Sequence, residues 1–378
     1  MRLLCLAFLY LCQVMPPNRK RQFTSLVLVC FLAVGLLGWY LLSRDSGEAP
    51  PLRPSAPAKI AGPPAGQRKT GPAPAATWPE FGTPEFNKMV LERGAAWLAT
   101  RGRDAASLVA AWDITGDTAL LDEAAEKFPN DPRVCIAMIA RLSAENSDAL
   151  PWIERFIALE PNNPEGHFLK IGPLMKAGDR DAALASLRRA VETKGKRDLH
   201  LRERMVTIRE AALASGAGIR DAARLAIAGP NSRGATYGSF NGLIKLLHGE
   251  IESAKSAGDH ERLIATASLG LGASEQFRAT DDRTLINDLA TMTLQRFTLA
   301  ELPDDMEYGT TGQTIGERRL AVAQQTEELK TFLKQGERLE ALREQASDSQ
   351  MAGYSDQYFL HGEKAAWEWL AAQMEQKK

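Results

Sequence analysis

Residues 146–195 read NSDALPWIERFIALEPNNPEGHFLKIGPLMKAGDRDAALASLRRAVETKG, and this stretch decides the fold. Two segments within it match at an offset of 34 residues, because the apolar positions 149, 150, 153 and 157 recur at 183, 184, 187 and 191. Apolar residues at these spacings share one face of a helix. The first copy ends at Pro161-Asn162-Asn163-Pro164, where proline stops the helix. The pattern therefore predicts stacked helical hairpins.

A helix-turn-helix of 34 residues is the unit of the tetratricopeptide repeat, and the chain resembles this family over about residues 105–228. Pro129-Asn130-Asp131-Pro132, at a spacing of 32 from the later proline stop, marks an earlier copy. We expect helix pairs at 104–114 with 117–128, at 165–177 with 181–193, and at 199–215 with 219–228. The first helices lack the Trp-Leu-Gly-Tyr signature of the family, which leaves the exact repeat class open.

After a stretch rich in helix breakers, residues 229–238, the sequence again favours helices, at 240–257, 261–271, 283–300, 316–333, 338–346 and 356–374. No strand-like alternation is found. Trp367, Trp369 and Leu370 predict an aromatic plug at the end of the stack. We expect an all-α body, with helical repeats over 81–228 as an α-α superhelical solenoid that continues into a C-terminal helical region over 239–378.

An uncharged run of 22 residues, Gln22 to Ser43, precedes this body. It is long enough to cross about 30 Å of hydrocarbon, and it predicts a single-pass transmembrane helix. Arg19-Lys20-Arg21 just before it places the N-terminus in the cytoplasm and the body on the exported side of the cell (inner) membrane. A cleaved signal peptide is the alternative, disfavoured by the length of the run. The chain lacks Asn-x-Ser/Thr sequons, which is ordinary for a bacterial protein.

Residues 1–21 form a short leader in this interpretation. The apolar run Leu3 to Val14 is too short to span a membrane. Either translation starts at Met15, or a hairpin of two membrane helices returns the body to the cytoplasm. Residues 44–80 are rich in proline, alanine and glycine, which predicts a disordered, extended linker. The linker is a passive spacer or, alternatively, a proline-rich docking site.

Charge and cysteine content limit the function classes. Residues 1–78 hold nine basic and two acidic residues, which leaves 37 basic and 45 acidic residues in the body. An acidic body argues against nucleic acid as the partner. Cys135 is the one cysteine of the body, so the body has no internal disulfide and no thiolate metal site. No nucleophile, base or metal-ligand set converges in the sequence, and we expect no catalytic residue, no cofactor and no metal.

These features predict a membrane-anchored scaffold or adaptor that binds partner proteins or peptides, and not an enzyme. Similarity to tetratricopeptide proteins implies that the first helices line a concave groove in which a partner's extended peptide or helix lies. With Ala183 as the anchor, the resemblance implies groove positions at Glu165, Phe168, Met175 and Lys176, and in the preceding copy at Val134, Met138 and Arg141. Core packing is the alternative for Phe168 and Met138.

Two other functions stay open at this point. One is a membrane-tethered helical enzyme that uses residues 302–315, the longest non-helical stretch of the body, which is otherwise an ordinary loop. The other is a purely structural envelope protein without a specific partner. The sequence specifies neither the partner nor the oligomeric state.

Overall fold

The computed structural model describes residues 84–228, 233–280, 284–308 and 312–375, all of which belong to one unit. The predicted leader, the predicted transmembrane helix Gln22 to Ser43 and the predicted linker lie outside the described residues. Among the helices of the described ranges, none combines the length and the apolar character needed to cross a bilayer.

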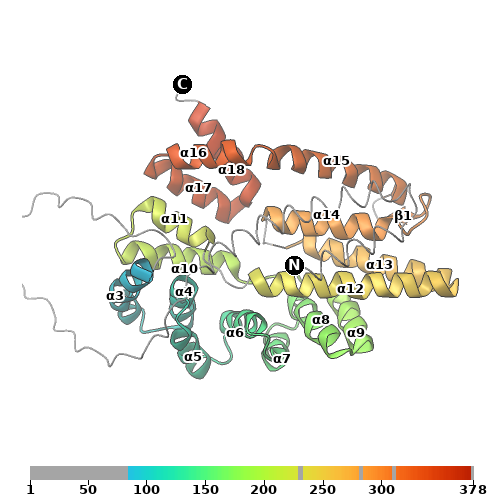
Figure 1. Cartoon of the computed structure of the whole chain (residues 1–378), viewed down its shortest axis with the longest axis horizontal. Coiled ribbons are helices and arrows are strands. Elements are labelled where there is room, and N and C mark those ends of the chain that lie inside the picture. Colours follow the sequence, from blue (N-terminus) through green and yellow to red (C-terminus); the bar gives the residue numbers. More distant parts are fainter. Residues whose placement is uncertain (1–83, 229–232, 281–283, 309–311, 376–378) are drawn as a thin grey trace, which may run out of the picture. The chain divides into compact units, whose positions relative to one another are not determined.

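The described residues confirm an all-α body (Figure 1). The helices before residue 229 are α3 (Pro84–Thr100), α4 (Ala105–Thr115), α5 (Thr118–Lys127), α6 (Pro132–Ala144), α7 (Leu150–Leu159), α8 (Glu165–Ala177), α9 (Arg180–Glu192), α10 (Leu201–Ala214) and α11 (Ile219–Ala228). The helices after it are α12 (Arg233–Ala257), α13 (His260–Arg278), α14 (Leu285–Leu299), α15 (Ile315–Leu333), α16 (Gly336–Gln345), α17 (Asp348–His361) and α18 (Glu363–Glu375).

The predictions for the second half need three corrections. The helix expected at 240 begins at Arg233, inside the stretch expected to break helices. The single helix expected over 356–374 is divided into α17 and α18 by Gly362, whose φ of 92° only glycine adopts easily. No strand was expected, yet β1 (Glu307–Tyr308) and β2 (Gln313–Thr314) form a short antiparallel pair that closes the loop before α15.

Turn residues mark several ends of the hairpin helices. An aspartate begins four of these helices, and its side chain accepts a hydrogen bond from a backbone N–H of the first turn; the four are Asp104, Asp117, Asp131 and Asp179. Gly116 and Gly178 end α4 and α8 in the left-handed conformation, with φ of 69° and 79°. These capping residues divide the chain into the hairpins α4–α5, α6–α7 and α8–α9.

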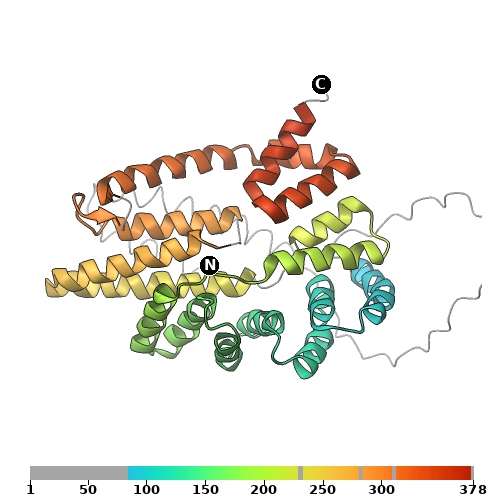
Figure 2. The ribbon, with the colours of Figure 1, turned by 180° about the vertical axis from the view of Figure 1, so that it is seen from behind.

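The hairpins stand in a row, and two later helices run along one side of it (Figures 1 and 2). Helix α10 packs on α4, while α12 packs on α6 and α8. Helices α13, α14 and α15 follow α12 in succession, each packed on the one before it. Helix α11 contacts α17, which in turn packs on α18. The second half of the chain therefore covers a face of the hairpins that the first half leaves open.

Residues distant in sequence share the hydrophobic cores. The first core joins the hairpin residues Leu108 and Ile139 to Tyr354 and Trp367 from α17 and α18. The second core joins α8 and α9 to α12, α13 and α14. The stretch 229–238, expected to be a boundary, therefore does not separate two cores. Trp367, expected in an aromatic plug, is buried with 6% of its surface exposed.

The contact between α8 and α12 is built around a proline. Pro173 lies inside α8 and has no N–H, so the carbonyl of Leu169 loses its usual donor one turn later. The hydroxyl of Ser239 on α12 donates to this carbonyl at 3.3 Å. Gly172 and Gly242 face each other at the same crossing, where a Cβ on Gly242 would lie 2.9 Å from Cα of Gly172. Helix α12 is therefore fitted to α8 by backbone-to-backbone contact.

Candidate functional site

Three of the seven predicted groove positions lie in the protein core. Val134 is fully buried, Met138 is 8% exposed, and Phe168 is 2% exposed. The ring of Phe168 packs edge-on against Phe277 of α13, with centroids 5.1 Å apart, and Leu243 of α12 belongs to the same core. Core packing, the alternative raised for Phe168 and Met138, therefore describes their positions. Phe168 is buried because α12 and α13 share the second core with α8, whereas Val134 and Met138 are buried in the first core.

Glu165 is also buried, and it has a partner within the chain. Its carboxylate binds the guanidinium of Arg197 at 2.5 Å, with both side chains no more than 2% exposed. The guanidinium carbon of Arg197 lies 3.7 Å from the ring centroid of Phe277, a cation–π contact that compensates part of the loss of hydration. The charge of Glu165 is thus neutralised by Arg197 of the same chain, and this ion pair links α8 to the strap.

Arg141 and Met175 are half-buried. Arg141 forms ion pairs with Asp122 of α5 and Glu145 at the end of its own helix. Met175 packs against the second core. These contacts occupy the side chains but leave part of their surface exposed.

Lys176 alone among the seven predicted positions is exposed, and it lines a groove. This groove, which we call the hairpin groove, has a volume of about 590 Å³. Its walls are the turn between α6 and α7 (residues 143–150), the last turn of α8 (172–177) and Gly238 with Ser239 of α12. The ammonium of Lys176 donates to the carbonyl of Asn146 at 3.4 Å. The carboxylate of Asp148, on the opposite wall, accepts from the N–H of Leu150 at 2.9 Å.

A second site, which the sequence did not indicate, lies where α9 passes into α10. Residues 193–200, here called the strap, cross the turn of residues 160–164, here called the second proline turn. Gly195 lies so close to this turn that a Cβ on it would be 1.6 Å from the carbonyl oxygen of Asn162. The amide of Asn163 donates to the carboxylate of Glu160 and to the carbonyl of Asp198, both at 2.7 Å.

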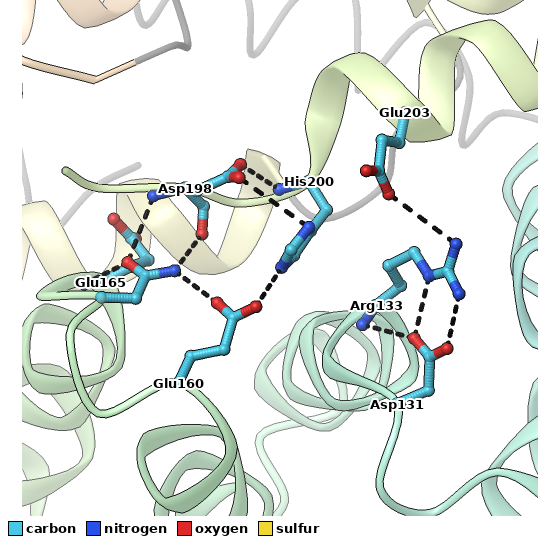
Figure 3. A network of polar contacts seen from close by, with 8 residues as sticks. Asp131, Arg133, Glu160, Glu165, Asp198, His200 and Glu203 are labelled. Carbon is cyan, nitrogen blue, oxygen red and sulfur yellow. Dashed lines mark hydrogen bonds and ion pairs between the residues drawn. The ribbon is translucent and has the colours of Figure 1, made fainter. Parts of the chain in front are cut away.

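His200 ends the strap and joins it to Glu160 (Figure 3). Its Nε2 lies 2.9 Å from the Glu160 carboxylate, and its Nδ1 lies 3.8 Å from the Asp198 carboxylate. The backbone of His200 is left-handed, with φ of 53°, and its own N–H donates to Asp198 at 2.7 Å. Both ring nitrogens therefore face carboxylate oxygens.

The first proline turn, residues 129–132, reaches the same region. Arg133 binds Asp131 through two nitrogens and lies 3.7 Å from Glu203 in the first turn of α10 (Figure 3). The two proline stops, recognised in the sequence by their spacing, thus contact consecutive parts of the chain: the second contacts the strap and the first contacts the start of α10. That spacing is the signal from which a common contact could have been inferred, although it does not identify the strap.

The environment shifts the pKa of both partners of the His200–Glu160 contact. Burial lowers the pKa of His200, but the hydrogen bond to Glu160 and the charges of Asp198, Glu160 and Glu203 outweigh burial, so that the pKa rises. Burial raises the pKa of Glu160, but hydrogen bonds from His200 and Asn163 outweigh it, so that the pKa falls. The contact therefore favours a charged imidazolium against a charged carboxylate.

A cavity of about 210 Å³ adjoins the strap. Its lining includes Asp198, His200 and Arg202 on one side and Thr284 and Tyr358 on the other. Among the residues described, no group of three or more histidine, cysteine, aspartate or glutamate side chains is arranged to hold a metal ion.

The loop expected to be either ordinary or chemical, residues 302–315, is fixed to its neighbours. Tyr308 is 7% exposed, and its hydroxyl bonds to Glu275 of α13. Burial, followed by this hydrogen bond, raises the pKa of Tyr308 to about 12. Asp304 pairs with Arg319 of α15, and Arg319 also donates to two backbone carbonyls of the α14 end. The described part of the loop thus contributes to the third core, around α13 and α15.

Comparison of the chain with models of known protein families, with curated protein sequences and with solved structures finds no match.

Proposed function

We propose that the protein is a membrane-anchored helical scaffold, similar in design to tetratricopeptide-repeat proteins, that binds a partner protein through the hairpin groove. The observation that carries the proposal is an open groove of about 590 Å³ beside Lys176, between the α6–α7 hairpin and the α8–α9 hairpin. Extended peptides suit such a site because its walls are turns and helix ends that offer backbone groups.

The partner segment that suits the groove is extended and carries an acidic side chain. Asp148 already caps the start of α7, whereas no carboxylate of the described residues lies within 4.0 Å of the Lys176 ammonium. A partner carboxylate would gain a charge-assisted hydrogen bond there. The rest of the segment would lie along Pro173 and Leu150, which form an apolar part of the groove wall.

Gly238 offers a way to close the groove without disturbing the fold. A Cβ at this position would meet no atom within 4 Å, so a larger side chain has room to extend into the groove. Replacement of glycine inside a helix also favours the helix, by up to about 1 kcal/mol for alanine. We expect Gly238→Leu to fold and to block the groove, while Gly238→Ala folds and leaves it open.

The test has two parts. First, peptides selected from a random library on the full-length protein should be acidic and should lose binding in Gly238→Leu and Lys176→Glu. Second, a protein crosslinked to the full-length chain in its own membranes should be lost in the same two variants. Gly238→Ala and Arg188→Glu, a charge reversal on the exposed side of α9, are the matched controls. Binding that survives both groove variants would place the interaction elsewhere and reject the proposal.

The membrane part of the proposal rests on the sequence. The uncharged run Gln22 to Ser43 and the basic residues before it support a single-pass anchor in the inner membrane of a bacterium, with the described body exported. A protease added to intact spheroplasts should then degrade the body. Protection of the body until the membrane is opened would support the hairpin alternative, in which the body is cytoplasmic.

A further inference from the structure

The strap contacts two parts of the body that also share the second core. On one side it lies on the second proline turn, through Gly195 and Asp198. On the other side the side chain of Gln276 donates to the carbonyl of Thr193 at 2.8 Å, and Thr280 donates to the carbonyl of Arg197 at 3.1 Å. The strap therefore holds the α6–α9 hairpins against α13.

His200 is placed so that its protonation affects this connection. Imidazole is the side chain whose ordinary pKa lies within the physiological range. The acidic groups around it are Glu160 from the end of α7, Asp198 from the strap and Glu203 from α10. Among basic groups, Arg133 of α6 lies beyond Glu203, and Arg202 lines the same cavity as His200. The acidic groups nearest to the ring thus favour a positive charge on it.

We propose that protonation of His200 controls how firmly the strap is held. The protonated imidazole holds the strap on the second proline turn, and loss of the proton loosens the strap. We call the contact of the His200 ring with Glu160 and Asp198 the latch. A neutral imidazole has one N–H, so it donates to only one of the two carboxylates, Glu160 or Asp198, and leaves the other charge uncompensated. Asn163 keeps its hydrogen bonds to both segments, so the strap loosens without leaving its place.

The direction of the pH effect follows from the two shifts. The pKa of His200 is raised above its ordinary value of 6.5, so its contribution is complete below that pH and is lost as pH rises through the higher value of the folded protein. The pKa of Glu160 is lowered from 4.5, so its contribution is complete above that pH and is lost on acidification through the lower value. The latch is therefore closed between about pH 4.5 and 6.5 and opens above this range.

Hydrogen exchange of the full-length protein tests the proposal. The amide of His200 donates to the Asp198 carboxylate within the strap site, so its protection reports the latch. After correction for intrinsic exchange, we expect this protection to fall about fivefold between pH 5.5 and 8, because hydrogen bonds to charged groups are stronger than neutral ones. Local exchange is the suitable readout, since His167 of α8 also titrates and burial lowers its pKa.

Two variants and one control separate the latch from a general pH effect. Glu160→Gln keeps the shape of the side chain but removes its charge, and His200→Asn removes the imidazole with a residue that tolerates the left-handed backbone. Both should make strap protection independent of pH. His260→Asn, at an exposed position in α13, should keep the wild-type response. The same response in Glu160→Gln as in wild type overturns the proposal. Should His200→Asn not fold, titration of the wild-type His200 ring by NMR decides, and a pKa below 6.5 overturns it as well.

Discussion

The contact between Ser239 and Leu169 allows a quantitative test of how α12 is fixed to α8. Ser239→Ala removes the donor at 3.3 Å from the Leu169 carbonyl, which Pro173 already deprives of its usual helical donor. Leaving a buried carbonyl unpaired costs about 1–3 kcal/mol. We expect the free energy of unfolding to fall by that amount.

Replacement of the proline should rescue this loss. In Pro173→Ala the new N–H donates to Leu169 within α8, so the Ser239 hydroxyl becomes a second donor to a carbonyl that is already paired. In that background Ser239→Ala should cost only about 0.5 kcal/mol, the lower end for a net hydrogen bond. The two substitutions should therefore be coupled by about 1 kcal/mol or more, well above the scatter expected for independent sites.

Urea unfolding of the full-length chain, followed by circular dichroism, measures all four members of this cycle. Ser186→Ala is the matched control, because Ser186 is equally buried and donates at 3.0 Å to the carbonyl of His167, which retains its own helical donor. Its loss should be small in both backgrounds. Additive losses for Ser239→Ala and Pro173→Ala would refute the reasoning, since the proline would then have no part in the α8–α12 contact.

Three further changes test other contacts. Gly195→Ala would bring a Cβ to 1.6 Å from the carbonyl oxygen of Asn162, so the strap must shift, and we expect a loss of about 1–3 kcal/mol by urea unfolding; an unchanged midpoint would contradict this packing. Arg204→Met removes the bidentate partner of the fully buried Asp113 carboxylate and should lower the free energy of unfolding by about 3–5 kcal/mol. Adding Asp113→Leu should recover most of this loss, and a double variant as unstable as the single one would contradict the reasoning. Burial raises the pKa of the Cys135 thiol to about 12, so a thiol reagent at pH 8 should modify Cys135 only after unfolding; rapid modification of the folded body would be inconsistent with its burial.

The positions at which the hairpin helices begin and end could be predicted from the sequence, because neighbouring residues along the chain determine them. The spacing of Pro129 and Pro161, together with the apolar periodicity around Ile153, indicates helices that begin after each proline turn, and the structure has them. The all-α body was predicted correctly for the same reason. The division at Gly362 was missed, since the surrounding residues favour a helix and one glycine alone rarely decides a break.

The groove could not be located from the repeat alone. The position of Phe168 follows from the helix period, but whether it faces a partner or the rest of the same chain depends on α12 and α13, which begin 65 or more residues later. An open array and a self-covered array place the same apolar residues on the same helix face. The strap was missed for a related reason, because His200 and Glu160 are 40 residues apart and neither belongs to a recognised motif.

The composition of the first core affects how the chain is made. Residues of α16, α17 and α18, among them Tyr354 and Trp367, complete a core whose other members lie between Leu98 and Ala226. This core is therefore unfinished while the ribosome adds the helices from α12 to α15. The apolar side of α11 that meets α17 remains uncovered until the final two helices have emerged. Packing of the N-terminal hairpins is therefore completed only when synthesis is almost finished. A nascent chain interrupted before α17 exposes this apolar surface to chaperones and proteases.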